Sequence, residues 1–357
     1  MNDTASTAIR RFTAAEGRRF MASALVAVGL PPADAESVAE MMALADLRGI
    51  DSHGIIRLAT YIRRVKAGGI NPRPKFRIVQ EAAATALVDG DNGMGHLIMR
   101  HAATIAVEKA AVTGVAWVGT RMSNHAGAAA CYAMIPLAHD MIGLYLAVAN
   151  NNHMAPWGGI EPLLGTNPIA VAIPTAEEPP IVLDIATTTT SFGKIRVAAD
   201  SGQTLPEGQV IDHDGNPITD PNEADHGLLL PIGGYKGFGL SLVFSLMGGL
   251  LNGTATGREA VSIEDVSTPG NTGQAIMALN VASFGPVAEY KRRVDKVARD
   301  LRTSKPLPGV SEVRYPGLNG HRTAAERAAS GIPIRTPLVA GLAKLAAELG
   351  IAPLALI

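Results

Sequence analysis

Apolar residues recur at helical spacing near both ends of the chain. Residues 13–48 predict two helices, the first of which begins with the capping pair Thr13 and Glu16. Residues 54–67 predict a third helix, which ends at the two glycines that follow it. Two more helices are expected near the other end of the chain, over residues 287–301 and 337–349.

The middle of the chain changes to short apolar runs separated by Gly, Pro and Asn, a pattern typical of β-strands. Strands are expected over residues 86–90, 114–119, 141–149, 169–173 and 181–183. Helices are expected over residues 97–112, 126–138 and 237–251, the last of which is apolar enough to be buried. The pattern predicts an α+β fold, with a mainly helical domain from residues 1–78 and 287–357 and an α+β domain of residues 79–286 inserted between them.

The composition is that of a globular chain with a large core. Hydrophobic residues make up 47% of the 357 residues and charged residues 18%. The net charge is −1 and aromatic residues make up only 4%, so the chain has neither the basic surface nor the stacking side chains that nucleic-acid binding requires. The same charge argues against binding to a membrane surface.

The single cysteine, Cys131, excludes an intramolecular disulfide, and its apolar neighbours indicate a small core residue rather than a nucleophile. Apolar stretches are interrupted well before the length of about 18 residues that a transmembrane helix needs. Residues 1–4 lack the basic and apolar regions of a signal peptide. We therefore expect a cytoplasmic protein.

Two segments combine a histidine with a hydroxyl group and a glycine. In the first, Ser52 and His53 precede Arg57 by one helical turn, and in the second His125 precedes Gly127. Each histidine lies at an expected helix start, where free N–H groups favour a bound anion. Histidine suits proton transfer and arginine suits a carboxylate, so the two segments indicate a site for a small acid, with either histidine as the proton carrier. No His and carboxylate pair has the spacing of metal ligands, so no metal is expected.

The glycine motif of a Rossmann fold is absent from the sequence. The pair Gly93 and Gly95 is followed by Ile98 where the third glycine belongs, and the pair Gly237 and Gly239 is followed by Leu242. The chain also begins with helices and not with the strand that opens a Rossmann unit. A nucleotide would therefore bind on a different scaffold.

Other loops could still contact a nucleotide. Gly233 to Gly237 include Lys236 and precede a helix, which suits a phosphate. Asp184 ends a strand, and a carboxylate there suits ribose hydroxyls. Each loop taken alone could equally be an ordinary turn, cap or strand end.

Taken in order, these loops resemble those of one known family. The matching blocks include Asp51-Ser52-His53-Gly54 with Arg57, Ser123-Asn124-His125 with Gly127, Ala155-Pro156-Trp157-Gly158-Gly159, Leu164-Gly165-Thr166-Asn167-Pro168, Leu183-Asp184-Ile185-Ala186-Thr187, Gly193-Lys194 and Lys236-Gly237-Phe238-Gly239-Leu240. The chain resembles the malate/L-lactate dehydrogenase family of the non-Rossmann type over most of its length. The resemblance implies NAD or NADP as cofactor, a homodimer, an active site at the boundary of domains and subunits, and an NAD(P)-binding domain with a largely antiparallel sheet.

The resemblance also implies roles for individual residues. His125 is the general acid/base or a neighbour of the cofactor, and Ser52 with His53 is a second candidate for proton relay. Arg57 would hold the substrate carboxylate in a bidentate grip, and Thr166 lies in a matching substrate turn. The implied cofactor contacts are Ser123, Gly127, Asp184, Ile185, Ala186, Lys236, Gly237, Pro316 and Gly317.

The implied reaction is hydride transfer between nicotinamide and a small 2-hydroxy acid or 2-oxo acid. Relatives that reduce cyclic imines, of the piperideine- or pyrroline-2-carboxylate type, tend to carry an acidic residue where this chain has Lys194, which disfavours that alternative. The polar residues 150–153 indicate an unusual polar substrate if they face it. A non-catalytic binding protein on the same fold is a third alternative, which the clustered Ser, His, Arg and Lys side chains disfavour.

Overall fold

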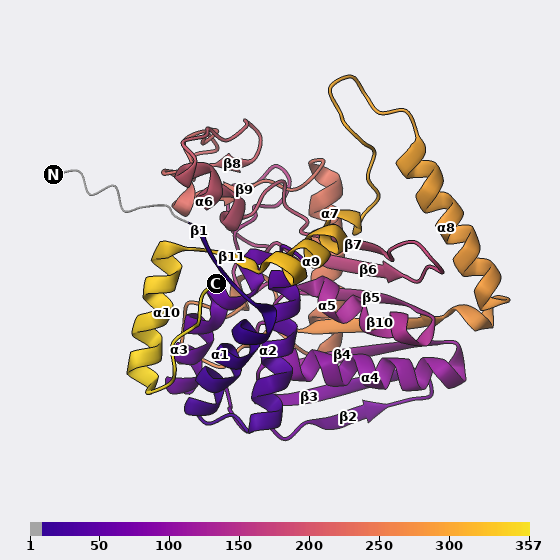
Figure 1. The fold of residues 1–357 in the computed structure, drawn as a ribbon, viewed down its shortest axis with the longest axis horizontal. Helices are drawn as coiled ribbons and strands as arrows, with labels where there is room; N and C mark the ends of the chain where they lie inside the picture. The colour runs from indigo at the N-terminus through magenta and orange to yellow at the C-terminus, as the bar shows by residue number, and fades with distance from the viewer. Residues whose placement is uncertain (1–8) are drawn as a thin grey trace.

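The computed structural model describes residues 9–357 and shows a mixed α/β fold (Figure 1). Residues 1–4, on which the expected absence of a signal peptide rests, lie outside the described residues. A seven-stranded sheet forms the centre of the molecule. Its strands are, in spatial order, β2 (Arg77–Glu81), β3 (Thr85–Gly93), β4 (Val115–Ser123), β10 (Gln274–Asn280), β5 (Met141–Ala147), β6 (Ile169–Ile173) and β7 (Ile181–Ile185).

Neighbouring strands of this sheet run antiparallel, with the exception of β3 and β4. The helix α4 (Gly95–Thr113) connects these two parallel strands. The sheet therefore lacks the doubly wound parallel order of a Rossmann fold. The predicted largely antiparallel sheet is confirmed.

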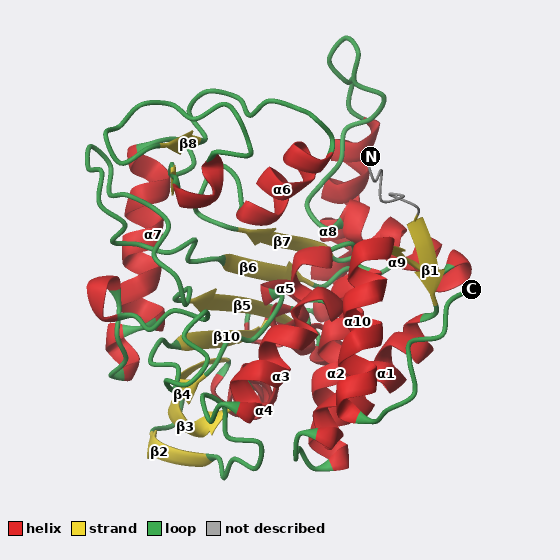
Figure 2. Cartoon of the chain, turned by 90° about the vertical axis from the view of Figure 1, so that its left-hand side faces the viewer, coloured by secondary structure: helices red, strands yellow, loops and turns green. Residues whose placement is uncertain are grey.

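Helices cover both faces of the sheet (Figure 2). On one face, α4 and the short α5 (Ala129–Ala133) pack on small strand residues such as Ala116 and Ala170, which let the backbones approach closely. The other face carries α7 (Tyr235–Gly248) and the 3-10 turn Leu250–Asn252. This packing is tight as well, since a Cβ at Gly119 in β4 would lie 1.9 Å from Asn252 Oδ1.

The two ends of the chain form a common hydrophobic cluster. It joins the first helices, α1 (Ala14–Ala27), α2 (Pro32–Leu47) and α3 (Leu58–Lys66), to the last helix, α10 (Thr336–Leu349). The strands β1 (Ile9–Phe12) and β11 (Ile332–Arg335) pair antiparallel beside it. The division into domains, with residues 287–357 in the helical one, stays a prediction.

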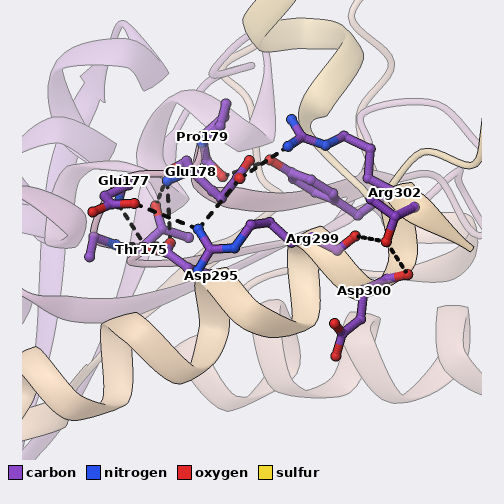
Figure 3. Close-up of polar contacts among 11 residues, drawn as sticks. Thr175, Glu177, Glu178, Pro179, Asp295, Arg299, Asp300 and Arg302 are labelled. Carbon is purple, nitrogen blue, oxygen red and sulfur yellow. Dashed lines mark hydrogen bonds and ion pairs between the residues drawn. The ribbon is translucent and has the colours of Figure 1, made fainter.

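The helix α8 (Val287–Thr303) lies away from this cluster, at the far end of the sheet, and a loop leads from it to α9 (Leu318–Ser330) (Figure 1). The buried carboxylate of Asp295 in α8 accepts hydrogen bonds from the backbone N–H groups of residues 176, 177 and 178, at 3.1, 3.0 and 3.3 Å. Arg302 forms an ion pair with Glu178 at 3.2 Å (Figure 3). One helix thus fixes the turn between β6 and β7.

The remaining elements form a small cluster beyond β7. They are α6 (Phe192–Asp200), β8 (Val210–Ile211) and β9 (Leu228–Leu229), and the last two pair as a two-stranded sheet. Ile195, Val210 and Leu229 form part of its core. This cluster brings the first turn of α6 close to Ser52, because a Cβ at Gly193 would lie 3.4 Å from the Cβ of Ser52.

The structure corrects two predicted helices. The helix predicted over residues 54–67 begins only at Leu58, and two 3-10 turns, Asp51–His53 and Ile55–Arg57, precede it because the backbone of Gly54, with φ −95° and ψ −139°, is not helical. The helix predicted over residues 126–138 is shorter too. It spans Ala129–Ala133 before a 3-10 turn that contains Pro136, which has no N–H for an α-helical bond. Neither histidine of the two segments therefore lies at the first turn of a long helix.

The prediction that the long apolar helix α7 is buried is wrong, because only one of its sides is buried. One side packs on the sheet through Ser241, Phe244 and Ser245. Its other side is exposed and apolar, and comprises Leu240, Leu242, Val243, Leu246 and Met247, continued by Leu250 and Leu251. Within residues 9–357, no helix is both long and apolar enough to cross a membrane.

Candidate active site

The fold brings the two histidine segments together. The rings of His53 and His125 stack with their centroids 5.5 Å apart and an angle of 16° between their planes. Both line a small cavity of about 70 Å³, which has room for several water molecules or a small organic acid. Its other polar lining residues are Tyr145, Asn150, Thr166 and Gln274.

The segment around His53 is held by its own hydrogen bonds. Ser52 Oγ lies 2.7 Å from His53 Nδ1, and Arg57 Nε donates to the carbonyl oxygen of Ser52 at 2.8 Å. The terminal nitrogens of Arg57 have no hydrogen-bond partner among residues 9–357, which leaves them able to bind an anion. The arginine, serine and first histidine of the predicted site therefore form one unit.

Asp46, on α2, positions this unit. Its side-chain carboxylate accepts the backbone N–H of Ile55 at 2.8 Å. The carboxylate approaches the chain so closely that a Cβ at Gly54 would lie 1.7 Å from Asp46 Oδ1. Burial raises the pKa of Asp46 to about 8, and the negative charge of Asp51 adds to the shift. Glycine at position 54 is thus required by the contact with a buried acid.

His125 is held from a different side. Its Nδ1 accepts the backbone N–H of Gly127 at 3.2 Å, and the hydroxyl of Tyr61 lies 2.7 Å from the same nitrogen. Tyr61 also contacts the ring of His96 edge-on, with centroids 5.3 Å apart. His96 is buried, and neither of its ring nitrogens has a partner among the described residues.

Burial and positive neighbours keep this cluster uncharged. Burial lowers the pKa of His53 to about 4, with a further contribution from Arg57. Burial also lowers the pKa of His125 well below its usual value, and His53, Arg57, His96 and Arg64 all act in the same direction. Near neutral pH both rings are therefore neutral, so each can take up a proton or donate a hydrogen bond.

Several predicted cofactor residues lie beside the cavity. Gly127 lines it, and so does Thr166, for which the resemblance implies substrate binding. The carbonyl oxygen of Thr166 accepts the N–H of Thr187 at 2.9 Å, which places Ile185 and Ala186, at the end of β7, next to the same turn. The carboxylate of Asp184 accepts the N–H of Ala130 at 2.9 Å and so caps α5.

Other predicted cofactor residues do not line the cavity. Ser123 is fully buried at the end of β4, where its hydroxyl donates to the carbonyl oxygen of Asn124 at 3.4 Å. Lys236 and Gly237 lie in the first turn of α7, and Lys236 is exposed. Pro316 and Gly317 lie along β7, since the carbonyl oxygen of Pro316 accepts the N–H of Val182 at 3.0 Å. A cofactor contacting Pro316 and Gly317 as well as the cavity would extend along β7, the edge strand, whereas the buried Ser123 offers it no exposed side chain.

The polar residues 150–153 are mainly structural. Asn150 lines the cavity, but its amide donates to Thr272 Oγ1 at 2.9 Å. The side chains of Asn151 and Asn152 bond to the segment of residues 257–263, and the ring of His153 packs edge-on against Phe192. Only the first of the four lines the cavity.

Sequence reasoning missed Tyr61, Asp46 and Gln274. Tyr61 had a detectable signal, since it follows Arg57 by four residues and therefore shares its side of a helix. Asp46 and Gln274 gave none, because their roles depend on contacts between distant segments. Cys131 is buried and burial raises its pKa to about 12, which agrees with the predicted core role. The described residues contain no group of three or more His, Cys, Asp or Glu that could hold a metal ion.

A largely antiparallel sheet with paired histidines and an arginine beside it fits a class of oxidoreductases that act on hydroxy acids. A model of the malate/L-lactate dehydrogenase family matches residues 12–343. Malate dehydrogenase from Pyrococcus horikoshii is 35% identical over 342 residues, which cover 93% of each chain. The chain therefore belongs to the malate/L-lactate dehydrogenase family.

Solved structures support the same family assignment. Sulfolactate dehydrogenase from Methanocaldococcus jannaschii superposes with a TM-score of 0.90 at 35% identity, over 96% of this chain and 98% of that chain. The delta1-piperideine-2-carboxylate reductase from Pseudomonas syringae superposes with a TM-score of 0.83 at 28% identity, over 94% and 99% of the two chains. The fold therefore serves proteins named for two kinds of substrate.

Proposed function

We propose that the protein is an NAD(P)-dependent dehydrogenase that transfers hydride between nicotinamide and a small 2-hydroxy acid or 2-oxo acid. The observation that supports this most is the cavity in which His53 and His125 stack, together with Arg57, which does not line the cavity but whose charge acts on both rings. A small cavity of this kind suits a short substrate with one carboxylate. The family supports the same reaction.

Each residue has one task in this proposal. Arg57 binds the substrate carboxylate through its terminal nitrogens, which orients the carbon that reacts. A neutral histidine takes the hydroxyl proton in oxidation and returns it in reduction, and His125 is the first candidate with His53 as the second. Thr166 contributes to the wall of the cavity.

The bound nicotinamide would supply or accept the hydride. Gly127, which lines the cavity, and Ile185 and Ala186, which precede the residue bonded to the turn at Thr166, would hold its ring end. Asp184, Lys236, Gly237, Pro316 and Gly317 would contact the rest of the dinucleotide. The choice between NAD and NADP is left to experiment.

A substrate panel tests this function. Purified protein is assayed with NADH and NADPH against 2-oxo acids of increasing size and against the cyclic imines piperideine- and pyrroline-2-carboxylate. The proposal expects turnover of at least one 2-oxo acid and poor turnover of the imines. Faster reduction of the imines would favour the alternative, which the likeness to the Pseudomonas syringae reductase keeps open.

Cofactor titration addresses the third alternative, a non-catalytic protein on this fold. Binding of NADH or NADPH, followed by the change in cofactor fluorescence, is expected in the micromolar range typical of such enzymes. Absence of binding of both cofactors would favour the non-catalytic alternative. The test needs no knowledge of the substrate.

The protein forms a homodimer in this proposal, and the exposed apolar side of α7 supports it. Leu242, Leu246 and Leu250 lie on that side at helical spacing and are 39%, 43% and 52% exposed. Contiguous exposed apolar surface of this kind marks interaction sites. Light scattering after gel filtration should give twice the mass of the chain, and Leu246→Glu should shift it toward the monomer. An unchanged dimer in that variant would place the interface elsewhere.

A further inference from the structure

Tyr61 contacts His125 from inside the protein. The tyrosine lies on α3 and is 1% exposed, and its hydroxyl lies 2.7 Å from His125 Nδ1. Among the described residues, this nitrogen is the only hydrogen-bond partner of the hydroxyl. A buried hydroxyl with one partner, directed at a candidate proton carrier, calls for an explanation.

The hydrogen bonds of His125 define which nitrogen is free for chemistry. Gly127 donates its backbone N–H to Nδ1, and a backbone N–H can only donate. Nδ1 must therefore carry a lone pair in this arrangement, and the proton of the neutral ring lies on Nε2. Nε2 has no partner among residues 9–357, so it is the nitrogen that a substrate in the cavity can reach.

Gly127 is fixed in this role. Its φ angle of +73° is one that glycine adopts most easily, and a Cβ at this position would lie 2.7 Å from His96 Nε2. The direction of its N–H therefore cannot adapt readily when His125 changes its protonation state. If Nδ1 of His125 gains a proton, Tyr61 is therefore the hydrogen-bond partner that has to change from donor to acceptor.

The reaction requires the opposite arrangement at Nδ1. To take the hydroxyl proton of a 2-hydroxy acid, Nε2 needs the lone pair, and the ring proton must then lie on Nδ1. After the transfer both nitrogens carry protons, and in reduction the Nε2 proton moves to the substrate oxygen, which again leaves a proton on Nδ1. Both reacting states thus have an Nδ1–H that needs an acceptor.

We propose that Tyr61 is a positioning residue for His125, whose hydroxyl donates to Nδ1 in the resting protein and accepts from Nδ1–H in the reacting states. A hydroxyl can exchange these two roles by rotating its hydrogen, whereas the N–H of Gly127 cannot. This inference rests on the proposed function of His125 as the proton carrier. It adds a residue that does not touch the substrate.

The charged neighbours of His125 make the Tyr61 hydroxyl more important as the acceptor for Nδ1–H. Those facing it from the elements around it are His53 on the first 3-10 turn, Arg57 on the second, Arg64 on α3 and His96 on α4. When positively charged, each of them opposes a positive charge on His125. The oxygen of Tyr61 is the one group in contact with Nδ1 that stabilises the charged ring.

Tyr61→Phe tests the inference, because it removes the hydroxyl and keeps the ring. We expect kcat to fall by about 10- to 100-fold in both directions, the effect of losing one hydrogen bond to a charged group, while KM for the acid changes little. The pH profile for oxidation should also shift, with its acid limb at lower pH than in the unmodified protein, because the charged form of His125 has lost its acceptor.

Tyr132→Phe is the matched control. Tyr132 is also buried, and its hydroxyl donates to the carbonyl oxygen of Ala126, the residue that follows His125. This variant loses a buried hydroxyl from the same loop but no contact with the ring. It should therefore lower stability without moving the acid limb, and an equal shift in both variants would overturn the inference.

The outcomes separate the inference from the proposed function. Loss of turnover in His125→Ala together with unchanged kcat and pH profile in Tyr61→Phe would refute the role of Tyr61 alone. Normal turnover in His125→Ala would remove the role of His125 as the proton carrier, on which the inference rests, and would leave the dehydrogenase function with His53 as the candidate. Nitrogen-15 NMR of histidine-labelled protein gives a test that needs no variant, since a resting neutral His125 should carry its proton on Nε2 and a proton on Nδ1 would overturn the inference.

Discussion

Arg57 combines two effects in one side chain. Its Nε anchors the carbonyl oxygen of Ser52, and its charge lowers the pKa of both His53 and His125. The guanidinium therefore fixes the segment that carries the first histidine and adds to the effect of burial, which is the main cause that keeps the pair neutral. Its remaining nitrogens have no hydrogen-bond partner in the part of the chain that the structure describes, so in the proposed function binding and proton transfer depend on the same residue.

Replacement of Arg57 separates these effects. Arg57→Ala should raise KM for the 2-oxo acid by about 10- to 100-fold through loss of a charge-assisted contact and should move the acid limb of the pH profile upward. Arg57→Lys keeps the charge and should leave the acid limb in place while KM still rises. Steady-state kinetics against pH measure both effects. The exposed Arg63, on the helix α3 that follows, provides the control, and a rise in KM of equal size in Arg63→Ala would contradict the assignment.

Asp46 should make stability depend on pH. Its folded-state pKa of about 8 is above the usual value, so the folded protein binds this proton more tightly than the unfolded chain. The resulting stabilisation is fully present below about pH 4 and is lost as the pH rises toward 8. In Asp46→Asn, urea unfolding should show a smaller loss of stability over this range. A loss identical to that of the unmodified protein would show that Asp46 does not titrate there.

At the scale of elements, local patterns predicted most of the fold. The capping pair at Thr13 and the short apolar runs of the strands are encoded by neighbours in sequence, and these elements lie close to their predicted places. The segments around the two histidines were predicted less well. Gly54 and Pro136 interrupt the helical pattern there, and the contact of Asp46 with Ile55 comes from another helix. The apolar sequence of α7 could not reveal that only one of its sides packs on the sheet.

The contact between Asp295 of α8 and the β6–β7 turn gives a test at the same scale. Asp295→Ala removes the acceptor of three backbone N–H groups and should lower the free energy of unfolding by about 3 kcal/mol or more. Asp300, on the same helix, forms an exposed ion pair with Lys296 at 2.5 Å, and Asp300→Ala should cost less than about 1 kcal/mol. Chemical unfolding of both variants measures the difference. Similar losses of unfolding free energy in the two variants would show that the contact of Asp295 with the turn is not a main contact of α8.

At the scale of the whole molecule, the site forms where the first helices of the chain, which pack against its last helix, meet the central sheet. His53 comes from the helical part and His125 from the end of a central strand, and their meeting could not be derived from spacing alone. The order of family blocks in the sequence anticipated the pairing. It did not anticipate that the implied cofactor residues extend from the cavity along β7, or that Ser123 is buried.

The initial rate of the His125→Ala variant tests the central claim most directly. The assay uses the cofactor and 2-oxo acid that the panel identifies, and the exposed His321→Ala variant serves as control for the loss of a histidine. General acid–base catalysis contributes about 10²- to 10⁴-fold, so kcat/KM of His125→Ala should fall by at least about 100-fold while His321→Ala keeps the normal value. A value of kcat/KM in His125→Ala within a few-fold of the unmodified protein would contradict the account.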